Sequence, residues 1–444
     1  MFLCQLTDAK NITITVLPKN PKEATAFIQS EIDNCSQNGG GKVTLPASRF
    51  VCGTIILKSG VGLIFPKNCE MIGDTNPDLF PLQNPINTWY LGKEGHHHRA
   101  LIYAENAQNI SLEGKGILDA QGEIVFQNWI SGKQAFRWML FLFTNCENIK
   151  VKGLTMKNSP SWMQLYQGCR NLEIKNILVE NFGAKNNDGL DLDACEHVKI
   201  SNCKIDSDDD ALVIKSLSPG KMNNIFIKNC TLSSNCNAFK TGTESQSSLS
   251  NIRAKNIQIT TASKKSRIYN RQVGLAAVAL TMVDGGRLEN VILKNFRIKG
   301  YKVPIFIRQG KRNRTHLGFD SSLKSSRIDN ITFRKFQIKM ESDIPNHITA
   351  VDSGSISNLN FKKIHIDYQP IDSICLGPIR KNFEENPKAY PEATGFKNAL
   401  PLTIWYLRNV QKARFSSIKI TKNKNPIVID PKFVFEKSSG IFFE

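Results

Sequence analysis

The sequence lacks long hydrophobic runs. Its longest apolar stretch, Trp138 to Phe143, has six residues, whereas a membrane-spanning helix needs roughly 20, so a transmembrane protein is excluded. The N-terminus also lacks the basic segment and the apolar stretch of about 7 to 15 residues that a secretory signal requires. We therefore expect a cytoplasmic protein if Met1 is the true start. With 41% hydrophobic residues among 444, the chain can bury a large core.

Cysteine spacings typical of zinc sites are also absent. None of the 11 cysteines forms a Cys-x-x-Cys pair or a Cys/His set, so we expect no structural zinc. Cys146, Cys169 and Cys195 recur at one phase of a repeat. Because a free cysteine packs as a small apolar side chain, we favour a buried stack of thiols over a disulfide framework.

Acidic residues are few, 39 against 58 Lys and Arg, and the net charge is +19. Such a charge favours polyanionic partners, which include nucleic acid, an anionic membrane and an acidic polysaccharide. The basic segments 264–271 and 311–314 carry neither an interleaved aromatic motif nor a helix-turn-helix pattern. We therefore interpret them as solvated loops at the rim of a cleft and expect no nucleic-acid partner.

A short phrase, Asn followed by Ile, Leu or Val and then by alternating apolar residues, recurs through most of the chain. Between Asn148 and Asn251 it returns every 23 to 27 residues, with His197 once in place of Asn. Such a period indicates a solenoid, and the period-2 alternation within each unit indicates strands. No sustained helical spacing is present for βαβ units. We therefore predict an all-β fold, a right-handed parallel β-helix, with the repeated Asn in tight turns and side-chain ladders.

The first coil of a solenoid needs a cover. Asn20, Pro21 and Glu23 have the pattern of a helix N-terminus, and apolar residues from Ala24 to Cys35 follow at helical spacing. We predict an N-terminal capping helix here. The predicted organisation is a cap with the first coils over 1–90, the catalytic β-helix over 91–430 and a closing segment over 431–444.

Seven aspartates fall within two short segments, Asn186–Asp193 and Asp206–Asp210. Asp188 and Asp210 are separated by about one coil, so stacked coils would bring their carboxylates close together. Like charges at close range push pKa values apart, which lets one group stay protonated while another is ionised. Glycoside hydrolysis needs such a pair. A calcium site and a plain surface turn remain alternatives.

Two of these segments resemble motifs of the polygalacturonase family, glycoside hydrolase family 28. Asn-Asn-Asp-Gly-Leu-Asp at 186–191 is similar to its Asn-Thr-Asp-Gly-Ile-Asp, and Asp-Asp-Ala-Leu-Val-Ile-Lys-Ser at 209–216 to its Asp-Asp-x-Ile-x-Ile-Lys-Ser. Segments 39–47, 53–59 and 114–122 match its N-terminal half. The resemblance implies an exported, inverting hydrolase that needs no metal or cofactor. It further implies that Asp209 is the general acid and that Asp188 and Asp210 hold and activate water.

The chain departs from the family pattern at two places. Cys236-Asn237-Ala238 stands where the polygalacturonases have Gly-His-Gly, and Ala279-Leu280-Thr281 stands where they have the Arg-Ile-Lys that grips the galacturonate carboxylate. The chain resembles instead a divergent bacterial branch with Cys-Asn-Ala-Phe-Lys-x-Gly-Thr-Glu and Tyr-Pro-Glu-Ala-Thr segments, here ending at Thr394. Lys240 and Arg308 are then the cations best placed to replace the lost pair, although either could be structural.

Further residues are assigned by position. The expected substrate contacts are Asn186, Lys215, Asn237, Lys240 and Arg308, and Lys215 could equally be a structural partner of the aspartates. His96, His97 and His98 are successive and cannot all converge on a metal if extended, so plain surface or a cleft-lining loop is favoured. Trp129, Trp138 and Trp162 could stack on sugars, but core packing is the more frequent fate of tryptophan.

We therefore expect a monomeric glycoside hydrolase that cleaves pectin-type acidic polysaccharide with inversion. Two alternatives stay open: a polysaccharide lyase on the same fold, and a non-catalytic carbohydrate-binding β-helix that has lost the chemistry.

Overall fold

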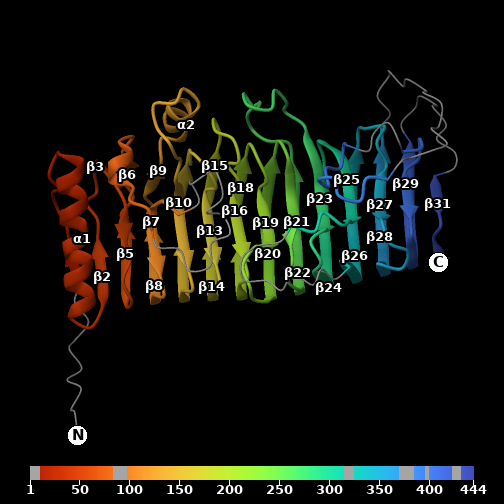
Figure 1. Cartoon of the computed structure of the whole chain (residues 1–444), viewed down its shortest axis with the longest axis horizontal. Helices are drawn as coiled ribbons and strands as arrows, with labels where there is room; N and C mark the ends of the chain where they lie inside the picture. Colours follow the sequence, from red (N-terminus) through yellow and green to blue (C-terminus); the bar gives the residue numbers. More distant parts are fainter. Residues whose placement is uncertain (1–10, 84–97, 315–324, 370–384, 396–399, 423–431) are drawn as a thin grey trace, which may run out of the picture. The chain divides into compact units, whose positions relative to one another are not determined.

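A computed structural model describes residues 11–83, 98–314, 325–369, 385–395, 400–422 and 432–444. The chain divides into two compact units, residues 1–205 and 206–444, and each is described by itself. Both units consist of parallel strands stacked coil on coil (Figure 1), so the predicted parallel β-helix is confirmed. The finer division at residues 90 and 430 stays a prediction.

The first unit begins with helix α1, Pro21–Gln37, which covers strands β2 (Gly41–Thr44), β3 (Arg49–Cys52) and β4 (Ile55–Ile56). The Asn20 side chain accepts hydrogen bonds from the backbone N–H groups of Lys22 and Glu23, at 2.9 and 3.2 Å. The buried face of α1 carries Ala24, Ile28, Ile32 and Cys35. This confirms the predicted capping helix (Figure 1).

The remaining elements of the first unit form three parallel stacks of short strands with helix α2 between coils. Their bounds are β1 Ile12–Thr13, β5 Val61–Phe65, β6 Glu70–Gly73, η1 Pro77–Leu79, β7 Ala100–Glu105, β8 Gln108–Gly114, β9 Ile117–Asp119, α2 Gly122–Ile130, β10 Met139–Thr144, β11 Glu147–Lys152, β12 Thr155–Lys157, β13 Gln164–Gln167, β14 Arg170–Lys175, β15 Leu178–Asn181, β16 Leu190–Asp193 and β17 Glu196–Ser201. Strand β18, Lys204–Ser207, contains the division between the units.

The second unit has two parallel sheets. The long-strand sheet contains β20 Met222–Ser234, β22 Leu249–Thr260, β24 Arg287–Ile298, β26 Arg327–Met340, β28 Ile356–Tyr368, β30 Val410–Lys422 and β32 Ser439–Phe443. The short-strand sheet contains β19 Leu212–Ser216, β21 Asn237–Ser245, β23 Gly274–Met282, β25 Tyr301–Gln309, β27 Asn346–Ala350, β29 Trp405–Arg408 and β31 Phe433–Glu436.

Identical positions of successive coils stack both inside and outside the solenoid. In the second-unit core, the rings of Phe333, Phe361 and Phe415 stack at centroid distances of 4.9 and 4.8 Å. At the corners, the repeated Asn residues adopt positive φ, as the turn prediction requires. Asn171 donates to Asn148 at 3.1 Å across one coil step, which confirms the predicted side-chain ladders.

Cys146, Cys169 and Cys195 are buried free thiols in the first unit, as expected. Each thiol lies 3.2 to 3.4 Å from a backbone carbonyl oxygen. Among the residues that the structure describes, no helix is long and apolar enough to cross a membrane.

Candidate active site

The acidic turn of the second unit lies directly before β19. The apolar residues of β19 are buried, and this anchors the preceding Asp209 and Asp210 at the edge of the short-strand sheet. The Asp209 carbonyl oxygen accepts hydrogen bonds from Ser207 Oγ at 2.8 Å and from Ser234 Oγ at 2.6 Å. Both aspartates are thus held on a turn that buried hydroxyl groups fix.

Residues of the next coil hold the Asp210 carboxylate. Its Oδ2 lies 2.6 Å from Lys240 Nζ, and both side chains are buried, with 5% and 7% of their surface exposed. Its Oδ1 accepts from the backbone N–H of Asn237 at 3.0 Å and from Asn237 Nδ2 at 2.6 Å. The buried Asp210 side chain thus has three hydrogen-bond donors, one of which is the Lys240 ammonium group.

Lys240 also faces an exposed aromatic ring. Its Nζ lies 3.2 Å from Tyr390 Oη and 5.7 Å from the centre of that ring. Burial lowers the pKa of Lys240, but Asp210, Tyr390 and Glu244 together outweigh burial and hold the pKa well above its ordinary value. Lys240 is therefore a fixed positive charge beside the acidic turn.

Asp209 has a different environment from its neighbour. Its Oδ1 accepts from the backbone N–H of Asp210 at 2.9 Å, and its Oδ2 accepts from Tyr269 Oη at 2.5 Å. Burial raises the pKa of Asp209, and the adjacent Asp210 charge raises it further, against the opposing effects of Tyr269 and Lys240. The two carboxyl groups are thereby differentiated: Asp210 is paired with a cation, and Asp209 has a raised pKa.

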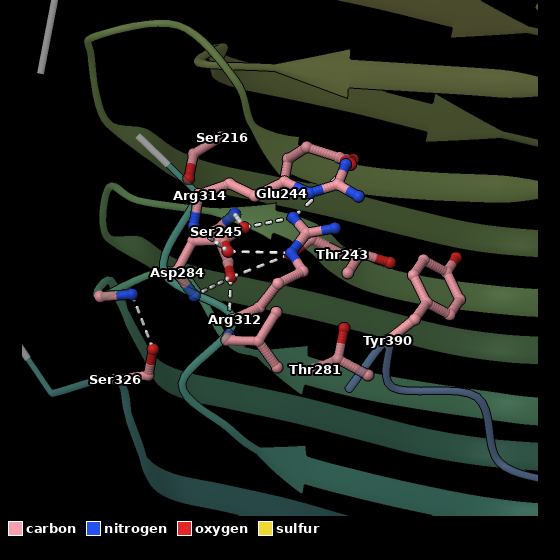
Figure 2. Close-up of polar contacts among 12 residues, drawn as sticks. Ser216, Thr243, Glu244, Ser245, Thr281, Asp284, Arg312, Arg314, Ser326 and Tyr390 are labelled. Carbon is pink, nitrogen blue, oxygen red and sulfur yellow. Dashed lines mark hydrogen bonds and ion pairs between the residues drawn. The ribbon is translucent and has the colours of Figure 1, made fainter. Parts of the chain in front are cut away.

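A second charge cluster lies at the C-terminal end of β21 (Figure 2). Arg312 donates to both oxygens of the buried Asp284, with Nε 2.9 Å from Oδ1, and its Nη2 lies 3.7 Å from Glu244. Burial would raise the pKa of Glu244, but the positive charges of Lys215, Arg312 and Lys240 lower it to about 2. Glu244 is therefore a carboxylate surrounded by three cations.

The five substrate contacts expected from the sequence fall in different surroundings. Asn237 and Lys240 bind the Asp210 carboxylate, and Lys215 is buried in β19 and acts electrostatically on Glu244. Arg308, with 3% of its side chain exposed, forms an ion pair with Glu385 and donates to Thr349 Oγ1 at 3.1 Å. Burial lowers the pKa of Arg308 to about 10.

Asn186 and Asp188 belong to the first unit. Asp188 is 5% exposed, and its carbonyl oxygen accepts from Met163 N at 2.8 Å and from Asn181 Nδ2 at 3.0 Å. Asn186 precedes it with a φ of 55°. The turn that carries Asp188 is thus fixed by buried hydrogen bonds within its own unit, and the expectation that Asp188 joins Asp209 and Asp210 stays a prediction.

The tryptophans and histidines of the first unit also have defined places. Trp138 is fully buried and stacks on Phe80 at 3.8 Å, and Trp162 is 6% exposed, so core packing accounts for both. Arg137 lies over the half-buried Trp129. His96 and His97 lie outside the described residues, whereas His98 is buried, which lowers its pKa to about 4.

The expectation that segment 311–314 is a solvated loop is wrong for Arg312, whose side chain is only 5% exposed, because Asp284 and Glu244 compensate its charge. In segment 264–271, Lys264 and Lys265 are exposed, but Tyr269 reaches Asp209 and Arg271 donates to the Asn235 carbonyl at 2.8 Å. Within the described residues, no group of three or more His, Cys, Asp or Glu could hold a metal ion.

Sequence reasoning did not assign Tyr269, Glu244 or Glu385 to the site. Tyr269 and Glu385 come from segments between strands, where no periodic pattern predicts the direction of a side chain. A signal did exist for Glu244, because it lies four residues after Lys240 on β21, one coil after the acidic turn.

Comparison with known proteins places the chain among carbohydrate-active proteins. The sequence profile described as Glycosyl hydrolases family 28 matches residues 35–382. A probable polygalacturonase of Vitis vinifera is 27% identical over 192 residues, 42% of this chain and 39% of the relative. Exopolygalacturonase B of Aspergillus niger is 25% identical over 278 residues, 58% of this chain and 61% of the relative.

A solved structure supports the fold. The Yersinia enterocolitica family 28 exopolygalacturonase aligns with a TM-score of 0.66 at 14% identity, over 97% of this chain and 78% of that one. The alignments with the two curated relatives described above span 39% and 61% of those proteins' own length.

Proposed function

Because the chain belongs to family 28 of the glycosyl hydrolases, we propose that it hydrolyses glycosidic bonds in a pectin-type acidic polysaccharide. The names of its relatives, polygalacturonases of a plant and a fungus, support this substrate class. The net charge of +19 also suits a polyanionic substrate.

The proposed mechanism is a single displacement with inversion. Asp209 donates its proton to the oxygen of the leaving sugar, and Asp210 with Asp188 positions a water molecule and accepts a proton from it. The observation that carries this assignment is the unequal environment of the adjacent carboxyl groups. Asp210 is bound to Lys240 at 2.6 Å, whereas burial and the Asp210 charge raise the pKa of Asp209.

The neighbouring cations have two roles in this proposal. Lys240 uses two of its three N–H donors on Asp210 and Tyr390, so one N–H remains for a substrate carboxylate. Asn237 holds Asp210, and Asn186 contacts the sugar from the turn before Asp188. Arg308 and Lys215 act mainly through Glu385 and Glu244, with which they interact inside the protein.

The test is hydrolysis of a panel of pectic oligosaccharides with and without EDTA. We expect new reducing ends, inverted anomers in the first NMR spectra and no effect of EDTA. Asp209→Asn should lower kcat by roughly 10² to 10⁴ with substrate affinity largely retained. The control is Asp78→Asn, which changes an exposed aspartate far from Asp209 in the sequence. Products with an ultraviolet-absorbing double bond would identify a lyase instead, and binding without products would identify a non-catalytic β-helix.

A further inference from the structure

The long-strand sheet of the second unit carries a column of cations that the catalytic proposal does not use. Lys228 pairs with Lys255, Lys255 with Lys294, Lys294 with Arg334 and Arg334 with Lys362, each in register on the next coil. We call these five residues the cationic ladder. Each step joins neighbouring parallel strands, so the charges follow one another at roughly 4.8 Å.

The cationic ladder is open to solvent and has no acidic partner within the described part of the chain. Lys255, Lys294, Arg334 and Lys362 are exposed, and Lys228 is half-buried. None of the ion pairs found among the described residues involves these five side chains. Like charges on directly opposed strand positions destabilise a sheet, so the fold itself gains nothing from this arrangement.

The corner beside the cationic ladder carries further positive charge. In three successive coils this corner holds Asn229, Asn256 and Asn295, linked by hydrogen bonds of 2.9 and 2.8 Å. In the next two coils Lys335 and Lys363 occupy it, with φ values of 60° and 57°. A lysine in the left-handed region is disfavoured relative to asparagine. Two exposed positive charges are thus kept at positions where asparagine fits better.

The corresponding column of the first unit, four positions after each corner residue, is mixed in charge. It runs Glu113, Lys152, Lys175, Ser201 in register. Glu113 is opposed to Lys152, and opposite charges on opposed positions stabilise the sheet. Lys152 and Lys175 are the single pair of opposed cations in this column, whereas the cationic ladder of the second unit continues over five coils without interruption.

We propose that the cationic ladder, together with Lys335 and Lys363, is a docking surface for a linear polyuronate chain, separate from the acidic turn. A polyuronate repeats one carboxylate per sugar, which matches a linear series of cations. The acidic turn lies on the short-strand sheet of the same unit and the ladder on the long-strand sheet. The surface would therefore retain a long substrate on the protein while another part of the same polymer is cleaved.

The choice of a polyuronate over nucleic acid rests on the proposed function and on one contact. Surfaces that bind single-stranded nucleic acid combine cations with free aromatic rings on which bases stack. Among the described residues, the ring of Phe226 lies beside the ladder, and Lys255 and Lys228 already lie over it at 5.3 and 6.0 Å from its centre. The ladder therefore offers charge without a stacking platform.

The experiment measures binding of sodium polygalacturonate to the full chain in the Asp209→Asn background, which separates binding from hydrolysis. The ladder variant combines Lys255→Gln, Lys294→Gln and Lys362→Gln. The matched control combines Lys150→Gln, Lys175→Gln and Lys199→Gln in the first unit, which removes the same charge. Thermal unfolding of both variants checks that they fold.

We expect the ladder variant to bind polygalacturonate roughly tenfold more weakly at low salt, with a shallower dependence of log K on log salt concentration. The control variant should change affinity by less than about twofold. Fully methyl-esterified pectin, which has lost its carboxylate charge, should bind both variants equally. In the wild-type Asp209 background, kcat and KM for a short oligosaccharide should not change.

Equal affinities of the two variants for polygalacturonate would overturn the inference. Tighter binding of single-stranded DNA than of polygalacturonate at the same salt would overturn the choice of polymer. If the wild-type protein binds polygalacturonate through the ladder but releases no sugar from any pectic substrate, the proposed function fails and the docking surface stands.

Discussion

The acidic turn and the cationic ladder, two regions of the second unit, handle charge in opposite ways. At the turn, Asp210 and Lys240 are buried and 2.6 Å apart, because an unpaired charge away from water is costly. On the ladder, five cations, four of them exposed, stand in register without acidic partners in the described structure. Water and salt weaken the repulsion between these cations, so the row costs little folding free energy. A buried charge thus affects the pKa of its neighbours, whereas an exposed charge is available to attract a binding partner.

Lys240→Met should have the largest effect on stability. It leaves the Asp210 carboxylate buried without a cation, and we expect a loss of about 3 to 5 kcal/mol of unfolding free energy. Lys294→Met, the same change on the ladder, should stay within about 0.5 kcal/mol. Urea unfolding of both variants measures the difference. Adding Asp210→Asn to Lys240→Met should recover part of the loss, and absence of any recovery would contradict the pairing.

Glu244→Gln should have a large effect that depends on pH. The surrounding cations lower the pKa of Glu244 from 4.5 to about 2, so its carboxylate stabilises the folded state above pH 4.5. That contribution is lost as the pH falls towards 2. We expect the variant to be less stable at pH 7 by on the order of 3 kcal/mol and to approach the wild type near pH 2. Urea unfolding at the two pH values tests this, and a constant difference would refute it.

Tyr269→Phe should have a smaller effect, a shift of the pH profile of kcat/KM. The Tyr269 hydroxyl group donates to Asp209 and opposes the rise of its pKa. Without this donor the pKa of Asp209 should rise further, so the acid stays protonated to higher pH. The alkaline limb of kcat/KM should therefore shift upwards. Phe226→Leu, on the ladder face, is the control, and a downward shift in Tyr269→Phe would contradict the role of the hydroxyl group.

A single ladder substitution should have the smallest effect. Lys294→Gln removes one of the five ladder charges, and we expect roughly a twofold loss of polygalacturonate affinity at low salt and none at high salt. The measurement is polygalacturonate binding to immobilised Asp209→Asn protein, with and without Lys294→Gln, at low and at high salt. A loss that persists at high salt would show that Lys294 makes a specific contact, which an exposed ladder position does not predict.

Much of the fold was predictable because it repeats. Asn at the corners, alternation in the strands and the capping pattern from Asn20 to Cys35 are local signals, and the structure confirms each of them. The acidic turn was also predictable from a local signal, because its motif directly precedes a buried strand. Lys240 was expected to contact the substrate or to be structural, and the structure brings it to Asp210, about one coil earlier in the sequence.

The rest of the site depends on contacts that no period encodes. Tyr269 reaches Asp209 from 60 positions away, and Arg308 pairs with Glu385 from 77 positions away. Arg308 was expected to contact the substrate as a free cation. Its ion pair could not be foreseen, because Glu385 belongs to a segment outside the repeat.

The left-handed lysines at 335 and 363 have a consequence for protein engineering. Restoring asparagine at both corners would relieve backbone strain of about 1 kcal/mol each and extend the corner hydrogen bonds. A search for heat-resistant variants would select these two changes early. The same changes would remove positive charge from the face that we assign to polymer retention, so gains in heat resistance at these corners would come at the expense of hold on long substrates.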